Sequence, residues 1–523
     1  MKKGFLAVIM FGLCLALAPS APAVQPAEDQ TAHMAVGVDD IGTLDPNVAS
    51  KIGEVPIIQL VYESLLRHPP GAIDNKRLQP SLAVKWEVGE DKLTWTFHLR
   101  KGVQWHEDFG EFTAEDVKFS IDRILDPEAG MPVRKNLAAI DSVSIVDTHT
   151  VQIKTKKPTP DLPDLMINDR MGFIICKKAF EKLGKDLNYQ PIGTGPFRRL
   201  VYKPRESLTL VANKKYWGGE PALRKVVFHF MSDNSTREMA LRSGEVHAIN
   251  IPAKQEWIDR LRKAGFQVDL TSPANMFTLY FNLTQKPLDH KKVRMALCHA
   301  INRRELIKYL GADVAKPEVS PLPSGYIGHT DEVVKYPYDP EKAKKLLVEA
   351  GFSGGFKLSM NISNSNIYLP PLQVIQEMWK QIGVDMELKV VDHPTYHKLI
   401  RQDVNPVVIY GAHRYPYTGT IYLTQFYHSD SIVGKPGAIT NFSHYGEALP
   451  GVDQYIEDAR FELDVKKQAA LWEAAQKQIK ADCVSFPLFT RLYAMAKSTK
   501  LDLGFEQKSW SFYHLGKDSR ILK

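Results

Sequence analysis

The spacing of apolar residues changes period repeatedly along this chain, and that change limits the fold classes open to it. Residues 93–105 alternate between apolar and polar side chains, which is typical of a half-buried strand. Residues 113–125 then show helical spacing, and Thr113 and Asp116 are placed as an acidic variant of the capping box. A chain that switches between these periods must cover its strands with helices, so the sequence predicts mixed α/β structure.

The same change of period continues along the rest of the 523 residues. Further strands are expected within 35–46, 142–155, 172–176, 206–217, 225–231, 356–363 and 384–392, and helices within 54–66, 236–246, 293–301, 340–352, 371–383 and 464–482. Hydrophobic residues make up 44% of the chain and charged residues 24%, which is an ordinary globular composition. A chain of this length is expected to form more than one lobe or domain.

The N-terminus differs in composition from the rest of the chain. A basic start at Lys2 and Lys3 precedes an apolar run over 5–18, and a small-residue Ala-Pro-Ala sequence ends at Ala23. This order is typical of a secretory signal peptide. A lipoprotein signal would need a small residue before Cys14, and leucine is not small. We therefore predict cleavage after Ala23 and a soluble exported protein.

The charge of the chain argues against a nucleic-acid partner. The net charge of +7 falls to +5 when segment 1–23 is removed, because that segment carries two lysines and no other charged side chain. A nucleic-acid-binding protein would instead carry clustered basic patches.

Three cysteines lie outside the predicted signal peptide: Cys176, Cys298 and Cys483. They are far apart and form no CxxC pair, so they predict neither a metal knuckle nor a dense disulfide framework. One bridge in an oxidising compartment and buried free thiols both stay open as interpretations.

Several segments of the chain, in order, match those of one protein family. They lie at 43–46, 62–66, 78–87, 93–107, 112–124, 193–204, 213–247, 281–306, 338–352 and 441–460. Together they span nearly the whole predicted mature chain. In these segments the sequence resembles the family 5 extracellular solute-binding proteins, the dipeptide, oligopeptide and nickel receptors of bacterial ABC importers.

The resemblance implies an α/β, two-lobed periplasmic binding protein fold of class II, in its large form with an extra subdomain and a ligand cleft between the lobes. The implied order is a signal peptide (1–23), the first part of lobe 1 (24–50), the extra subdomain of lobe 1 (51–190), the second part of lobe 1 (191–270), lobe 2 (271–488) and a C-terminal return to lobe 1 (489–523).

The resemblance also implies a function. The protein would be a monomeric periplasmic receptor, without a catalytic residue or cofactor. It would capture a small peptide-like or anionic organic solute and deliver it to ABC permease subunits in the inner membrane.

The segment GAHRYPYTGT (411–420) has neither helical nor strand periodicity, so we expect a loop. In peptide-binding members the matching segment carries an aspartate that pairs with the ligand's α-ammonium group. This chain has Arg414 there, and a guanidinium prefers a carboxylate or phosphate. We predict that Arg414 grips an anion, with His413, Tyr415 and Tyr417 around it. The alternative is an arginine that points outward or pairs with a protein carboxylate.

Two further arginines are ligand candidates through the resemblance. Arg170 precedes the apolar run at 172–176, and in the nickel-receptor branch an arginine near this position holds the carboxylate of a metal chelator. Arg134 follows the capped helix, in a segment that reaches the cleft in relatives. The alternative for Arg170 is a surface ion pair with Asp164 or Asp169.

No metal is expected, although histidines at two places could supply ligands. His393 and His397 are spaced i, i+4 on one face of an expected helix, but no third ligand is evident. His428 matches a region that can supply an axial metal ligand in nickel receptors, and is a weak candidate. A His-Ser pair is also common there in members that bind no metal.

The sequence lacks the usual enzyme motifs. It contains no GxSxG elbow, no HExxH and no GxxxxGK[ST] phosphate loop. A receptor for peptide-like solutes or small organic acids is therefore the leading interpretation. The alternatives are a nickel or metal-chelate receptor of the same family and, from another class, an enzyme or chaperone on the same fold.

Overall fold

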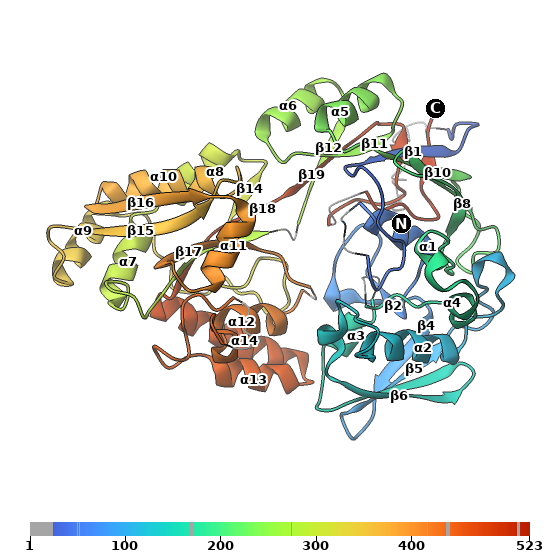
Figure 1. Cartoon of the computed structure of the whole chain (residues 1–523), viewed down its shortest axis with the longest axis horizontal. Coiled ribbons are helices and arrows are strands. Elements are labelled where there is room, and N and C mark those ends of the chain that lie inside the picture. The colour runs from blue at the N-terminus through green and yellow to red at the C-terminus, as the bar shows by residue number, and fades with distance from the viewer. Residues whose placement is uncertain are drawn as a thin grey trace, which may run out of the picture.

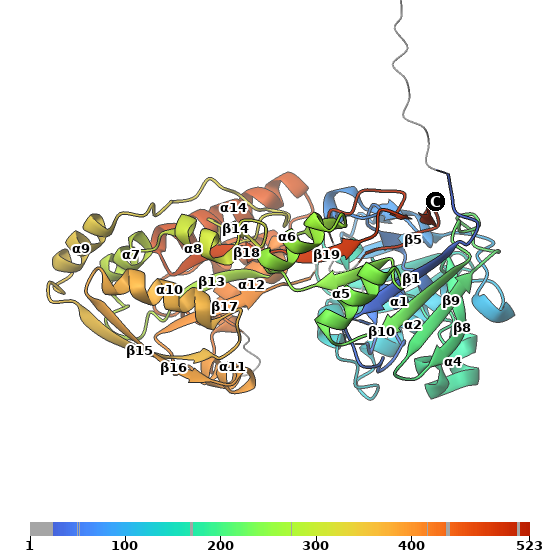
Figure 2. The same ribbon diagram turned by 90° about the horizontal axis from the view of Figure 1, so that it is seen from above.

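The computed structural model describes residues 25–49, 51, 53–167, 171–272, 275–415, 417–435, 440–509 and 513–523. These residues form two lobes that lie side by side along the longest axis (Figure 1). Seen from above, helix α6 (Gln255–Lys263) and strand β19 (Tyr493–Lys497) lie near the junction of the lobes (Figure 2). Within these residues, no helix combines the length and apolar character needed to cross a bilayer.

Lobe 1 is built on a seven-stranded sheet in the order β12-β19-β11-β1-β10-β9-β8. Its other strands are β1 (Thr31–Val36), β8 (Phe197–Lys203), β9 (Ser207–Ala212), β10 (Lys225–Phe230), β11 (Ala248–Ile251) and β12 (Gln267–Thr271). Strand β1 pairs in parallel with β10 and β11. Because neighbouring residues of a strand face opposite sides, Met34 packs with helix α1 (Val55–Val61), whereas Ala35 packs with α5 (Asn234–Ser243) and α6.

Lobe 1 also contains an antiparallel sheet in the order β4-β5-β7-β6. Its strands are β4 (Ala83–Val88), β5 (Thr94–Leu99), β6 (Ile140–Asp147) and β7 (Thr150–Thr155), and nearby lie helices α2 (Ala114–Leu125), α3 (Leu162–Leu165) and α4 (Lys177–Leu183) and the pair β2 (Leu66–Arg67) and β3 (Gln79–Pro80). Every second residue of β5 is buried, and Thr113 and Asp116 form the predicted capping box of α2. These elements share one hydrophobic core.

Lobe 2 has a central antiparallel sheet in the order β14-β18-β13-β17 and a parallel pair, β15-β16. The strands are β13 (Met276–Phe281), β14 (Ala315–Pro317), β15 (Phe356–Ser363), β16 (Val384–Val391), β17 (Val407–Ala412) and β18 (Ser485–Arg491). The helices are α7 (Lys291–His299), α8 (Arg303–Leu310), α9 (Pro340–Glu349), α10 (Leu369–Lys380), α11 (His393–Arg401), α12 (Gly419–Tyr427), α13 (Asp453–Phe461) and α14 (Val465–Asp482). Helices α12 to α14 gather on the side of lobe 2 that faces α3 of lobe 1 (Figure 1).

The chain crosses between the lobes twice. It passes from β12 in the large sheet of lobe 1 to β13 in lobe 2, and returns from β18 to β19 across Leu492. The last elements, β20 (Leu501–Asp502) and β21 (Arg520–Ile521), pair with each other and pack on the core of lobe 1. Two neighbouring crossings allow the lobes to move relative to each other as units.

The expected elements with strong local patterns are confirmed, including the hairpin β6–β7 and helices α5, α11 and α14. The expected strand at 172–176 is wrong. This run is buried but makes only an isolated bridge between Phe173 and Ser64, to which the bond from the Ile174 N–H to the Glu63 carbonyl belongs. The next N–H, that of Ile175, donates to the side-chain Oγ of Ser120 and not to a strand. The expected loop at 411–420 is shorter, since β17 extends to Ala412 and α12 begins at Gly419.

Candidate functional site

The loop between β17 and α12 reaches from lobe 2 to lobe 1. The Tyr415 hydroxyl donates a hydrogen bond of 3.0 Å to the backbone carbonyl of Asp164 in α3. The half-buried ring of Tyr415 packs against the hydrophobic cores of both lobes. The hydroxyl of Thr418, at the end of the loop, donates to Asp161 Oδ2 at 3.2 Å. The loop that the sequence singled out therefore lies where the lobes meet.

Arg414 is held in this loop through its own backbone. Its N–H donates to the Tyr326 hydroxyl oxygen at 2.9 Å, and that hydroxyl donates to the Arg414 carbonyl at 2.6 Å. The buried Tyr326 thus satisfies both the N–H and the carbonyl of Arg414 and holds the backbone of this residue in place.

The guanidinium of Arg414 has neutral partners. Its Nε donates to Gln425 Oε1 and its Nη1 donates to the His413 carbonyl at 3.1 Å. Its central carbon lies 5.1 Å from the ring centroid of Phe426 and 6.0 Å from that of Tyr410. In the described part of the chain no carboxylate lies within ion-pair distance of it, so its charge is not neutralised there. A half-buried guanidinium with spare donors is suited to a carboxylate or phosphate.

His413 and Tyr417 extend an aromatic wall beside this cation. His413 Nε2 lies 2.8 Å from the Tyr417 hydroxyl, and the Tyr417 ring stands edge-on to those of Tyr326 and Tyr415. Burial, helped by the neighbouring charge of Arg414, lowers the pKa of His413 to about 4. His413 is therefore neutral near pH 7, and Arg414 carries the positive charge of the loop.

Sequence reasoning missed the acidic pair that lobe 1 presents to this loop. Burial raises the pKa of Asp161, although the Thr418 hydroxyl of lobe 2 donates a hydrogen bond that lowers it. Burial and the neighbouring charge of Asp161 raise the pKa of Asp164 well above its usual range. The sequence did contain a signal, because two aspartates three apart lie on the same side of a helical turn.

The other predicted arginines are not brought to this loop by any contact that the structure shows. Arg170 lies outside the described residues. Arg134 is exposed at the start of a short 3₁₀ helix, Arg134–Leu137, and its Nε donates to the Leu125 carbonyl at 2.9 Å. Ligand roles for both residues stay predictions.

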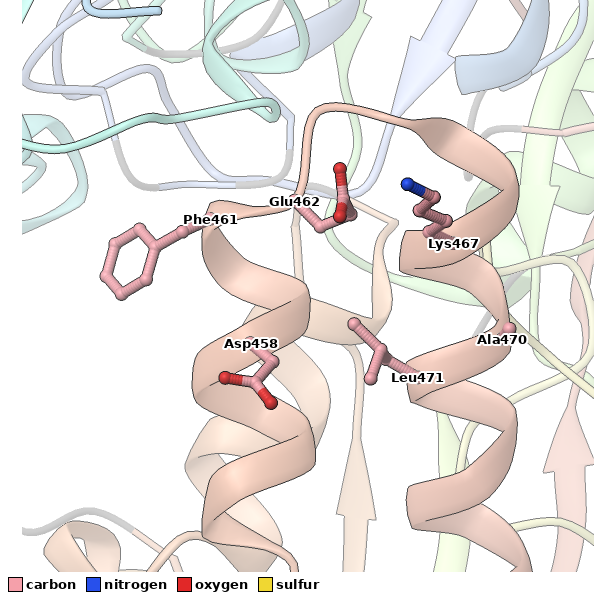
Figure 3. A pocket seen from close by; sticks show the side chains of 6 residues that line it. All are labelled: Asp458, Phe461, Glu462, Lys467, Ala470 and Leu471. Carbon is pink, nitrogen blue, oxygen red and sulfur yellow. The ribbon is translucent and has the colours of Figure 1, made fainter.

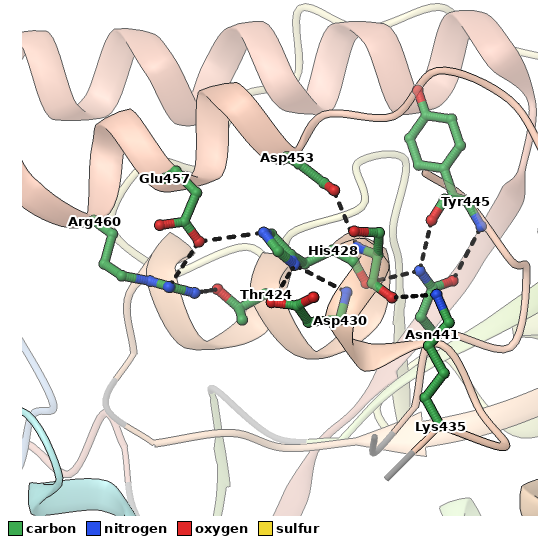
Figure 4. Close-up of polar contacts among 10 residues, drawn as sticks. Thr424, His428, Asp430, Lys435, Asn441, Tyr445, Asp453, Glu457 and Arg460 are labelled. Atoms are coloured by element: carbon green, nitrogen blue, oxygen red, sulfur yellow. Dashed lines mark hydrogen bonds and ion pairs between the residues drawn. The ribbon is translucent and has the colours of Figure 1, made fainter. Parts of the chain in front are cut away.

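His428 forms part of a polar network between α12 and α13 (Figure 4). Its Nε2 lies 3.2 Å from Glu457 Oε1, and its Nδ1 accepts a hydrogen bond from the Asp430 N–H at 3.1 Å. Arg460 pairs with Glu457 at 2.8 Å, and Asn441 donates to the His428 carbonyl. These contacts give His428 a structural role in joining the two helices.

The described residues contain no preformed cluster of metal-binding side chains. No group of three histidine, cysteine, aspartate or glutamate side chains there is arranged to hold a metal ion. His393 and His397 do lie together, with their Nε2 atoms 3.1 Å apart, and Ser363 contacts His393 Nδ1 at 2.9 Å. Burial lowers the pKa of His397 to about 4.

An open cavity of about 660 Å³ lies at the turn between α13 and α14. The side chains that line it are Asp458, Phe461, Glu462, Lys467, Ala470 and Leu471 (Figure 3). Phe461 also reaches lobe 1, where Lys157 Nζ lies 4.9 Å from its ring centroid. The cavity shares no lining residue with the Arg414 loop, so it is separate from the predicted anion site.

Comparison with known proteins identifies the family. The model for "Bacterial extracellular solute-binding proteins, family 5 Middle" matches residues 77–434, which is more than half of the chain. The chain belongs to this family. The resemblance inferred from the sequence is therefore confirmed.

Individual relatives agree with the family. The chain is 33% identical over 459 residues to Di/tripeptide-binding protein 2 of Pseudomonas aeruginosa, covering 80% of this chain and 81% of the relative. It is 31% identical over 379 residues to Heme-binding protein A of Haemophilus influenzae, covering 68% and 69%. Among solved structures, MoaA of A. tumefaciens R10 in complex with mannopinic acid has 36% identity and a TM-score of 0.75, over 95% of this chain and 100% of MoaA.

These comparisons confirm the predicted two-lobed periplasmic binding protein fold and the predicted class of function. The family consists of transport proteins that bind a solute for an ABC importer.

Proposed function

We propose that this family 5 solute-binding protein captures an organic anion between its lobes and that Arg414 grips the anionic group. The observation that carries the proposal is a half-buried guanidinium whose described partners are all neutral and which lies on the loop that joins lobe 2 to lobe 1. The relation to MoaA, whose structure contains mannopinic acid, supports an acidic solute.

The loop around Arg414 would serve both the ligand and closure of the lobes. A carboxylate could receive two parallel hydrogen bonds from the guanidinium, while Tyr415, Tyr417 and neutral His413 exclude water. Exclusion of water strengthens each polar contact. Tyr415 and Thr418 already link this loop to α3, so a ligand bound at Arg414 would favour the arrangement in which the lobes touch.

The proposal has further parts, which rest on the N-terminal sequence and on what family membership implies. The chain would be exported with cleavage after Ala23, act as a monomer in the periplasm and pass its solute to an ABC permease. The lobe boundaries given from the sequence, the ligand roles of Arg134 and Arg170, and the absence of catalysis are parts of this proposal.

A zwitterionic, peptide-like solute is the second candidate. It is favoured by the acidic pair Asp161 and Asp164, which lies on lobe 1 opposite the loop of Arg414. Such a solute could place its carboxylate on the arginine and its ammonium group near the aspartates. The relation to a protein named as a di/tripeptide receptor agrees with this candidate.

A thermal-shift and calorimetric screen of the purified mature protein tests the proposal. Each organic acid should be paired with its neutral amide, and the panel should include dipeptides, their amidated forms and nickel chelates. An acid present at a hundredfold excess over its Kd should add about 2.7 kcal/mol to the free energy of unfolding. Binding of the amides as tightly as the acids would contradict an anion site.

A further inference from the structure

Two cysteines that are 185 positions apart in the sequence meet in the core of lobe 2. Cys298 lies in α7 and Cys483 directly follows α14, and both are 0% exposed. Their Sγ atoms are 3.4 Å apart. A disulfide requires about 2.05 Å, so the two sulfur atoms must approach each other by roughly 1.3 Å for the bond to form.

The position of Cys483 is unusual for its residue type. Its φ of 54° places it in the left-handed region at the C-cap of α14, where glycine or asparagine is the ordinary choice. The position is held firmly, because Arg294 Nε donates to the Cys483 carbonyl at 2.9 Å and Arg294 Nη2 to the Asp482 carbonyl at 2.9 Å. The fold therefore keeps a cysteine at a strained turn directly beside another cysteine.

A buried lysine lies next to this pair. Lys480 is 1% exposed, and its Nζ lies over the rings of Tyr336 and Phe486 with no hydrogen-bond partner among the described residues. Burial lowers the pKa of Lys480 to about 8, so much of it keeps its charge near neutral pH. Burial alone would raise the pKa of Cys483, but a hydrogen bond from Cys298 and the charge of Lys480 outweigh it and lower that pKa.

We propose that Cys298 and Cys483 form a disulfide in the exported protein, because the fold brings their two buried sulfur atoms together. Members of this family act outside the cytoplasm, where thiols are oxidised. The thiolate is the nucleophile in disulfide exchange. The third cysteine, Cys176, lies in lobe 1 at the start of α4, where burial raises the pKa of its thiol to about 12.

The reaction requires a disulfide-containing oxidant, such as a periplasmic dithiol–disulfide oxidoreductase or oxidised glutathione. The Cys483 thiolate attacks one oxidant sulfur, which forms a mixed disulfide and releases a thiolate. Cys298 loses its proton, and its sulfur attacks Cys483 Sγ and displaces the second oxidant thiolate. The two protein thiols lose two electrons and two protons, and the oxidant gains them.

Differential alkylation of the protein purified from the periplasm tests the proposal. The full chain is denatured without reductant, treated with a maleimide and mapped by peptide mass. Cys176 should be labelled, and Cys298 and Cys483 should appear as one cross-linked peptide about 2 Da lighter than the sum of its parts. Labelling of all three cysteines without reductant would overturn the disulfide.

Stability gives a second measurement. A reductant should lower the thermal midpoint of the parent and of a Cys176→Ser control, but should leave a Cys298→Ser/Cys483→Ser double variant unchanged. Equal responses of all three proteins would contradict the disulfide.

Discussion

The two hydrogen bonds between the Arg414 loop and α3 allow closure of the lobes to be tested separately from ligand chemistry. Tyr415→Phe removes the hydroxyl that donates to the Asp164 carbonyl, and Thr418→Val removes the hydroxyl that donates to Asp161. Both changes keep the shape of the side chain. The ring of Tyr415 would still contact the ligand and both hydrophobic cores.

The size of the effect follows from the kind of bond that is lost. A hydrogen bond of this type contributes roughly 0.5 to 1.5 kcal/mol, so the double variant should lose about 1 to 3 kcal/mol of closed-state stability. If the free protein is mostly open, the apparent Kd weakens by the same free energy, which is roughly 5- to 150-fold.

Calorimetric titration of a solute found in the screen gives the Kd, and small-angle scattering gives the fraction of closed molecules. Tyr309→Phe is a matched control, because Tyr309 is 59% exposed in α8. The double variant should bind more weakly and stay more open at equal ligand concentration. Affinities of parent and double variant within about 0.3 kcal/mol would refute the idea that these bonds stabilise closure.

Other predictions concern stability. Burial lowers the pKa of His106 to about 4, so the protein should become less stable as pH falls below about 6.5, where the unfolded chain binds a proton that the folded protein does not. At pH 5 this lowers the free energy of unfolding by about 2 kcal/mol. In urea unfolding, His106→Gln should therefore lose about 2 kcal/mol less than the parent between neutral pH and pH 5. Gly193→Ala should lower the thermal unfolding midpoint, because a Cβ at this position would lie 1.8 Å from the Val61 carbonyl oxygen. Gly354→Ala is the control, because a Cβ there would have no other atom within 4 Å, and equal unfolding midpoints of the two variants would contradict this packing. Trp379→Ala should cost about 3 to 5 kcal/mol in unfolding titrations, because this fully buried indole fills the core of lobe 2 and donates to the Leu297 carbonyl.

Helices and strands that depend on residue patterns within one segment could be predicted from the sequence. Helix α2 followed from Thr113, Asp116 and an apolar stripe within one segment, and β5 followed from alternation alone. The apolar run at 172–176 misled the prediction because burial does not require a strand. Its backbone groups are satisfied by Glu63 and Ser120, which lie far away in the sequence.

The candidate site was only partly predictable for the same reason. The resemblance singled out Arg414, but its partners Tyr326 and Gln425 come from other segments and have no local pattern. The bond from Tyr415 to Asp164 spans 251 positions, and the contact of Cys298 with Cys483 spans 185. Long-range packing decides such pairs, and the local residue patterns on which these predictions rest do not reveal it.

Titration of the preferred organic acid into Arg414 variants tests the central claim most directly. Arg414→Ala should weaken binding by about 2 to 5 kcal/mol, because it leaves a buried anion without its partner. Arg414→Lys should recover only part of this, since an ammonium lacks the planar pair of donors. Arg304→Ala, an exposed arginine of α8 in the same lobe, serves as the control. The account predicts a large loss at Arg414 and none at Arg304, and equal affinities across the parent and all three variants would contradict it.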